Sequence, residues 1–145
     1  MSRLLIDTSI LIKWFHSEGE SEVEQARAIR SAHLRRDLDA HILDLAVYET
    51  GNVLLRALRW PGKVVAEQLS DLLVLLGPPL IMAGDWLRTA ATLADAHGLT
   101  FYDASWAAAA AELGIPLVSA DRLLLDAGLA ESAMHACERL GIQIG

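Results

Sequence analysis

The pattern of apolar and polar positions predicts short buried strands that alternate with longer helices. The chain opens on the apolar run Leu4 to Ile6, which ends in Asp7 and the hydroxyl pair Thr8 and Ser9. This order is typical of a buried strand followed by a helix that Thr8 or Ser9 caps. Further short β-type segments are predicted at 41–45, 80–82, 115–119 and 142–144.

Helical periodicity occupies the segments between these strands. The predicted helices run from the hydroxyl pair to Phe15, over 21–37, 46–58, 63–76 and 85–97, and from Asp103 through Glu112, with Asp85 as an N-cap and Gly98 and Gly114 just after helix ends. Strands that alternate with helices through short turns imply a mainly parallel sheet. We therefore predict one α/β domain, residues 1–145, with a mainly parallel central sheet of four to five strands flanked by helices.

The composition fits one globular domain without a membrane segment. The chain has 145 residues, of which 53% are hydrophobic and 21% charged, enough to bury a core. No apolar run approaches the ~20 residues of a membrane helix, and the N-terminus is not patterned as a signal peptide. We expect a cytoplasmic protein. Its single cysteine, Cys137, excludes an internal disulfide and is expected to pack in a helix.

The charge balance limits how nucleic acid could be bound. A formal net charge of -7 argues against general attraction to a polyanion. It does not argue against contact through a bound metal ion, which cancels the charge of the acids that hold it. Four arginines lie on the outer side of the predicted helix over 21–37, either as a solvated face or as RNA contacts: Arg27, Arg30, Arg35 and Arg36.

Four acids share one kind of position along the predicted sheet. Asp7, Glu49, Asp103 and Asp121 each end a strand or lie in the first turn of a helix. In open α/β sheets this edge is where ligands bind, so we expect the four carboxylates to converge there. Taken singly, each acid could instead be a helix cap or an acid favoured by the helix dipole.

A converging set of carboxylates indicates a site for a hard divalent cation. Mg²⁺ prefers oxygen ligands and keeps several waters, and Mn²⁺ accepts the same ligands. The five histidines have no ligand-like spacing, and no cysteine lies near the acids. Phosphate is the natural substrate of an oxygen-only site of this kind.

Four segments resemble the motifs of PIN-domain ribonucleases, in particular the VapC toxins of toxin–antitoxin pairs. These segments are Leu5-Ile6-Asp7-Thr8-Ser9-Ile10-Leu11, Val47-Tyr48-Glu49, Leu99-Thr100-Phe101-Tyr102-Asp103-Ala104 and Ile115-Pro116-Leu117-Val118-Ser119-Ala120-Asp121. Each motif is weak alone, but together, in this order and over nearly the whole chain, they are fairly specific. The resemblance implies a PIN-like fold.

The resemblance also implies an activity, a cofactor and partners. It implies a Mg²⁺-dependent or Mn²⁺-dependent endoribonuclease that leaves a 5′ phosphate and a 3′ hydroxyl. Asp7, Glu49, Asp103 and Asp121 would be its metal ligands and catalytic acids. Thr8, Ser9 and Ser119 match the family's polar positions and would position substrate. The implied partners are a structured RNA such as transfer or ribosomal RNA, a VapB-type antitoxin and a second copy of the chain.

Two polar residues follow Glu49 on its predicted helix. Asn52 and Arg56 come three and seven residues later, so regular α-helical spacing places them on the face of Glu49, where they could position substrate. For Arg56 an ordinary surface charge is an equal alternative.

Other functions for the acids fit the sequence less well. A haloacid-dehalogenase-like phosphatase needs a second aspartate two residues after the first, where Ser9 stands, and a receiver domain needs a late lysine, whereas Lys63 is the last lysine. A silent PIN-fold binding module and a different metal-dependent phosphohydrolase remain as alternatives.

Overall fold

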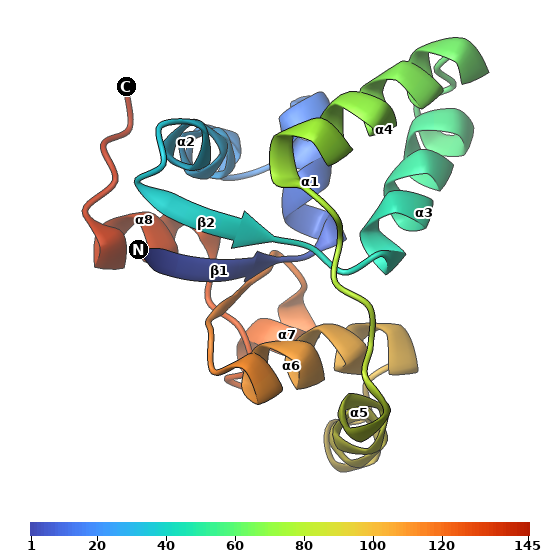
Figure 1. The fold of residues 1–145 in the computed structure, drawn as a ribbon, viewed down its shortest axis with the longest axis vertical. Helices are drawn as coiled ribbons and strands as arrows, with labels where there is room; N and C mark the ends of the chain where they lie inside the picture. The colour runs from blue at the N-terminus through green and yellow to red at the C-terminus, as the bar shows by residue number, and fades with distance from the viewer.

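The sheet consists of three parallel strands with the first strand in the middle (Figure 1). The structure is a computed structural model that describes residues 1–145. Its strands are β1 (Ser2–Ile6), β2 (Leu38–His41) and β3 (Leu117–Val118), in the order β2-β1-β3. In the register of the sheet, Leu4 pairs with Ala40 and Leu5 with Leu117.

Eight α-helices and one π-helical turn surround the sheet. They are α1 (Thr8–Phe15), α2 (Val23–Leu34), α3 (Leu45–Asn52), the π-helical turn η1 (Val53–Ala57), α4 (Gly62–Leu76), α5 (Gly84–His97), α6 (Phe101–Leu113), α7 (Arg122–Asp126) and α8 (Ala133–Leu140). In Figure 1, α1 to α4 lie on one side of the sheet and α5 to α7 on the other, with α5 packed on α6. The predicted α/β class with a parallel sheet is confirmed.

The core forms around β1 because this strand is central and helices cover both of its faces. Leu4, Leu5 and Ile6 are completely buried. Such continuous burial explains why the strand is apolar at successive positions rather than alternating. The buried run Leu4–Ile6 therefore holds the backbone rigidly up to Asp7, the next residue.

The sheet has three full strands rather than the predicted four to five, because the outermost segments on both sides pair through only one residue each. Leu80 bridges Leu43 beside β2, and Glu131 bridges Val118 beside β3, both in the parallel sense. Each bridge has two backbone hydrogen bonds of 2.8–3.0 Å. The predicted strand at 142–144 is wrong, since that segment follows α8 without pairing.

Several predicted element boundaries move in the structure. The strand expected at 41–45 lies at Leu38–His41, where Leu38 and Ala40 alternate with half-buried polar residues. The helix expected over 46–58 is regular only to Asn52. Asp85 is not an N-cap, because α5 already begins at Gly84. Gly98 and Gly114 do follow helix ends, with φ of 64° and 65°.

Two further expectations concern Cys137 and membranes. Cys137 is buried in α8, as expected for a packing residue. None of the helices combines the length and apolar character needed to cross a membrane.

Candidate active site

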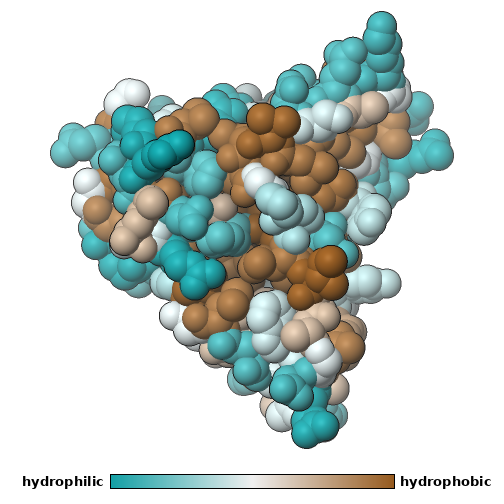
Figure 2. Space-filling model, in the orientation of Figure 1, coloured by the Kyte–Doolittle hydropathy of each residue, from teal (hydrophilic) through white to brown (hydrophobic).

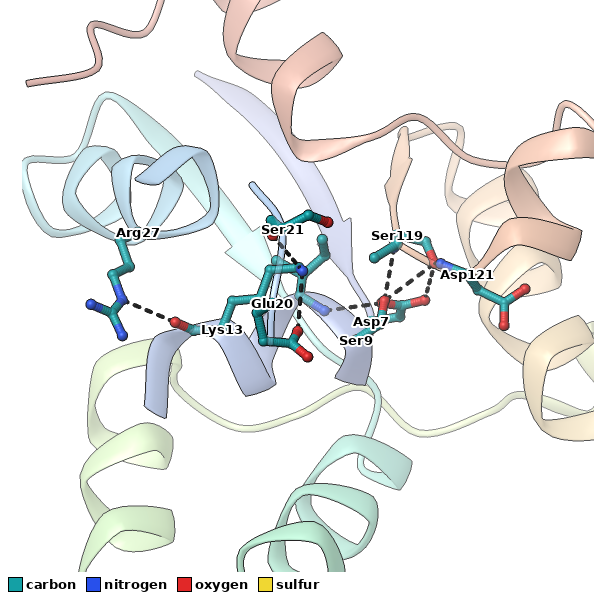
Figure 3. A network of polar contacts seen from close by, with 10 residues as sticks. Asp7, Ser9, Lys13, Glu20, Ser21, Arg27, Ser119 and Asp121 are labelled. Carbon is teal, nitrogen blue, oxygen red and sulfur yellow. Dashed lines mark hydrogen bonds and ion pairs between the residues drawn. The ribbon is translucent and has the colours of Figure 1, made fainter. Parts of the chain in front are cut away.

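Asp7 sits where β1 ends and α1 begins. It is itself the N-cap of α1, so the prediction that Thr8 or Ser9 caps this helix is wrong. Its side chain is 5% exposed, and both carboxylate oxygens accept hydrogen bonds, Oδ1 from the Ser9 hydroxyl and Oδ2 from the Ser119 hydroxyl (Figure 3). The capping contact from the N–H of Ile10 is longer, at 3.4 Å. Hydroxyl groups rather than the helix terminus therefore hold this carboxylate.

Burial controls the protonation of Asp7. Removal from water raises the pKa of its carboxyl group to about 6, and the hydroxyl groups of Ser119 and Ser9 and the N–H groups of Ile10 and Ser9 oppose the rise. No cationic side chain contributes to these effects. The carboxylate of Asp7 is therefore costly to keep charged without a cation.

The loop after β3 is fastened to Asp7 by the same two serines. The Ser119 hydroxyl, which donates to Asp7, accepts a hydrogen bond from the N–H of Asp121 at 2.9 Å. The Ser9 hydroxyl accepts from the N–H of Ala120 at 2.8 Å. Each serine thus uses its hydroxyl as donor and acceptor at once, and together they fix the backbone of Asp121 relative to Asp7.

Glu49 reaches the same edge of the sheet from α3. Its Oε1 accepts a hydrogen bond of 2.7 Å from the hydroxyl of Thr8, the first residue of α1. A contact between residues so far apart in sequence confirms that α1 and α3 present these side chains to each other. Thr8 therefore links the second acid to the element that carries the first.

Asp103 and Asp121 form a second pair of interacting acids. Burial raises the pKa of the Asp103 carboxyl group, the negative charge of Asp121 raises it further, and the hydroxyl of Thr100 opposes the rise. Thr100 caps α6, so Asp103 does not act as its cap. Asp121 does cap α7, accepting from the N–H of Leu124 at 3.1 Å.

The four acids lack a cationic partner. None of them forms an ion pair with a lysine, arginine or histidine. The side chains of the structure form no group of three or more acidic, histidine or cysteine residues that could hold a metal ion, so the expected convergence of all four carboxylates on one point is not seen. The donors are nevertheless all oxygens, and Mg²⁺ commonly uses one or two carboxylates and keeps its waters. The uncompensated, oxygen-only donor set therefore fits a hard divalent cation.

Comparison with known proteins agrees with this arrangement. The family model of the PIN domain matches residues 4–129, which contain all four acids. The chain belongs to the PIN domain family. Ribonuclease VapC3 of Pyrobaculum aerophilum is 31% identical over 129 residues, 86% of this chain and 93% of its own. Exonuclease VapC9 of the same organism is 41% identical over 91 residues, 58% of this chain and 63% of its own.

Two solved structures share the fold of this PIN domain. The crystal structure of PAE2754 from Pyrobaculum aerophilum superposes with a TM-score of 0.67 at 28% identity and covers 98% of both chains. The crystal structure of FitAcB from Neisseria gonorrhoeae has the same TM-score at 21% identity, covering 91% of this chain and 99% of its own. The second likeness concerns the fold alone.

The arginines on and just after α2 contact the protein itself to different extents. Arg27 donates to the carbonyl of Lys13 at 2.9 Å, and Arg30 to that of Trp14 at 3.4 Å, so both bind the C-terminal end of α1. Arg35 pairs with Asp37 at 2.9 Å on the surface. Arg27 and Arg30 are therefore half-buried against α1 rather than fully solvated, and RNA contact by the four arginines stays a prediction.

Asn52 and Arg56 are both exposed. Arg56 lies within η1, where hydrogen bonds skip one residue more than in an α-helix. The regular spacing that places Arg56 on the face of Glu49 therefore does not hold beyond Asn52. A role in positioning substrate stays a prediction for both residues.

Sequence reasoning missed one buried charge beside the site. Lys13, one turn after Ser9 on α1, is only 3% exposed and pairs with Glu20. The available signal was a lysine among the apolar residues of an amphipathic helix, which ordinarily indicates a side chain that reaches solvent.

Proposed function

We propose that this chain is a metal-dependent endoribonuclease and the toxin of a toxin–antitoxin pair. The observations that support the proposal are links between the acids Asp7, Glu49, Asp103 and Asp121, none of which is paired with a cationic side chain. Ser119 binds both Asp7 and the backbone of Asp121. Thr8, next to Asp7, donates to Glu49, and the charge of Asp121 acts on Asp103. Membership of the PIN domain family and the relative named Ribonuclease VapC3 support a nuclease. A catalytically silent binding module gives no reason for keeping four uncompensated acids at one edge.

In this proposal the four carboxylates hold Mg²⁺ or Mn²⁺ at the carboxyl end of the sheet. When bound there, such an ion would lower the pKa of a water molecule and stabilise the negative charge that develops on a phosphodiester. Ser9 and Ser119 orient the carboxylate of Asp7, and Thr8 orients that of Glu49. Burial of Asp7 strengthens its preference for a cation over water. The expected products carry a 5′ phosphate and a 3′ hydroxyl.

The proposed partners follow from the same site. The substrate is a structured RNA such as transfer or ribosomal RNA, met in the cytoplasm. A VapB-type antitoxin would block the acid cluster, and an arginine side chain could replace the cation there because it pairs readily with carboxylates. We also propose that the chain forms a homodimer through helices away from the acids.

The first prediction tests this function with a covalently closed circular RNA. Purified protein freed of antitoxin should linearise the circle in Mg²⁺ or Mn²⁺, and EDTA should stop the reaction. A circle also separates an endonuclease from an exonuclease, the activity in the name of the second relative. The 5′ end of the linear product should accept label from a kinase only after phosphatase treatment.

The matched variants are Asp103→Asn, which should abolish cleavage, and Asp85→Asn, an exposed acid outside the cluster that should not. Cleavage that persists in EDTA would contradict metal dependence. A circle left intact while linear RNA is shortened from its ends would make the protein an exonuclease.

A further inference from the structure

A hollow of about 410 Å³ lies directly beside the acid cluster. Its lining includes Ser9, Lys13, Glu20, Ser21, Val53 and Ala120. Ser9 belongs to both places, because its hydroxyl donates to Asp7 and accepts from the N–H of Ala120. We call this space the Lys13–Glu20 hollow. Ser9 therefore separates the hollow from Asp7 in the proposed reaction centre.

The buried Lys13–Glu20 pair is the distinctive chemistry of this hollow (Figure 3). The Lys13 ammonium group donates to Oε1 of Glu20 at 3.1 Å and to the carbonyl of Ser21 at 2.6 Å. The lysine side chain is 3% exposed and that of the glutamate 30%. Burying an ion pair usually gains little stability, because desolvation offsets the attraction. The pair therefore adds little to the free energy of unfolding, but it fixes the position of the Glu20 carboxylate at the hollow.

The loop that carries Glu20 is held in place independently of any ligand. The N–H of Glu20 bonds to the carbonyl of Ser17 at 3.0 Å, and Gly19 adopts a φ of 76° that suits glycine. Beyond it, the carboxylate of Glu22 accepts from the N–H of Met134 at 2.7 Å. The loop is therefore fixed to α1 on one side and to α8 on the other, which preorganises the wall of the hollow.

The charge of the hollow favours a base over a phosphate. Lys13 and Glu20 neutralise each other, so the hollow offers no net positive charge to a second phosphate group. What Glu20 offers is acceptor oxygens, one of them already turned toward Lys13. Carboxylates recognise bases by accepting from exocyclic amino groups. The volume also falls in the range of about 300–1,000 Å³ that is usual for ligand sites.

We propose that the Lys13–Glu20 hollow binds the base next to the scissile phosphate, with Glu20 accepting a hydrogen bond from the exocyclic amino group of adenine, cytosine or guanine. Lys13 is a positioning residue that acts through Glu20. Uracil is disfavoured because its single N–H lies between two carbonyl oxygens, which a carboxylate repels. This inference rests on the proposed ribonuclease function and adds to it a preference at one position.

The second prediction is a loss of base preference in Glu20→Gln. Single-stranded RNAs that differ only at the two positions flanking the cleavage site are compared by kcat/KM. Wild type should disfavour uracil at one of them by about 5- to 150-fold, the fold-change expected for one good base contact. Glu20→Gln should reduce this ratio toward one, because an amide also donates to uracil's carbonyl oxygens. Glu18→Gln, an exposed acid of the same loop, should keep it.

Two more variants separate positioning from folding. Lys13→Met should reduce the preference and Lys13→Arg should restore it, if the cation acts by orienting Glu20. Val53→Phe, which fills the hollow from η1, should raise KM several-fold and leave kcat nearly unchanged. Thermal melts of each variant must remain cooperative for the comparison to count.

Binding supplies a readout that does not depend on cleavage. The same RNAs, labelled with a fluorophore, are titrated by anisotropy against the Asp103→Asn protein with and without Glu20→Gln, and the affinities should show the same change in preference. Absence of cleavage by wild type would contradict the proposed function alone, and the binding series would still test the hollow.

A preference unchanged in Glu20→Gln, or no preference in wild type, would overturn the assignment. A Glu20→Gln variant that weakens only antitoxin binding would also overturn it, because the hollow would then bind a protein rather than a base.

Discussion

Asp7 combines deep burial with an uncompensated negative charge, and this combination is the strongest residue-level sign of a cation site. A helix cap on the surface would keep its carboxylate in water, and the capping N–H groups and helix dipole would lower its pKa. Burial instead raises the pKa of Asp7 to about 6, even though two hydroxyl groups bond to its oxygens. The hydrogen bonds orient the carboxylate without supplying the charge that would compensate it.

The third prediction concerns the pH dependence of metal-free stability. The native Asp7 retains a proton that the unfolded chain, with a pKa near 3.8, has already released between about pH 4 and 6. The contribution of Asp7 to the free energy of unfolding is therefore complete below pH 4 and is lost as the pH rises through 6. A shift of this size corresponds to ~3 kcal/mol.

Urea denaturation in EDTA at stepped pH measures this contribution as the difference between wild type and Asp7→Asn. That difference should fall by a few kcal/mol from pH 4 to 7, whereas Asp85→Asn should track wild type throughout. A wild-type curve that runs parallel to that of Asp7→Asn would show that Asp7 is an ordinary carboxylate.

At this scale the sequence located the four acids but not their support. An acid after an apolar run is visible in sequence, because strand and helix patterns place Asp7 and Asp121 at element ends. Ser9 and Ser119 were identified by the resemblance, but their hydrogen bonds to the backbone of Ala120 and to Asp7 were not predicted, since these partners lie more than a hundred residues away. Lys13 was missed because its burial depends on the carbonyl of Ser21 and on Glu20, which only the folded loop brings to it.

At the scale of elements, the alternative that these acids are merely helix caps holds for some and fails for others. Asp7 and Asp121 do cap α1 and α7, whereas Asp103 and Glu49 cap nothing. Capping and metal binding are compatible, because a cap needs one oxygen and a carboxylate has two. The position of an acid at a helix start therefore cannot alone decide between the two roles.

Element types were more predictable than element ends. The central strand and the glycine-terminated helices have strong local signals. The edge at Leu80 was predicted as a short strand over 80–82 and is a single bridge, whereas the bridge at Glu131 leaves no periodic pattern to detect. The sequence likewise gives no signal of the π-helical turn after Asn52, yet this turn changes which side chains share a face with Glu49. Tertiary packing, rather than propensity, decides these features.

At the scale of the whole molecule, exposed apolar side chains lie both beside the acids, as Tyr48 and Tyr102 do, and on a separate surface over α4. Figure 2 shows apolar side chains gathered over α4 and the segment that follows it. Val74 on α4 is 86% exposed, and Ile81 is 73% exposed. Exposed apolar area of this kind commonly marks a contact surface. The surface over α4 is therefore the contact through which we propose that the dimer forms.

The fourth prediction is a dimer mass in solution. Light scattering at micromolar concentration should give twice the 15.7 kDa of one chain. Val74→Lys should shift the protein toward monomer, because a charge cannot be buried there without a partner. Leu123→Lys, an exposed position on α7 near Asp121, should leave the dimer intact. A monomer mass for wild type would contradict the proposal.

The central claim is that four acids from separate elements act together as one cation site, and thermal melts in Mg²⁺ and in EDTA test it most directly. An ion at 100 times its dissociation constant should stabilise wild type by about 2.7 kcal/mol. Asp103→Asn should gain far less from Mg²⁺. In EDTA the variant should be at least as stable as wild type, because it removes the repulsion between Asp103 and Asp121. Equal Mg²⁺ shifts in both proteins, or an Asp103→Asn protein strongly destabilised in EDTA, would contradict the claim and make Asp103 a structural residue.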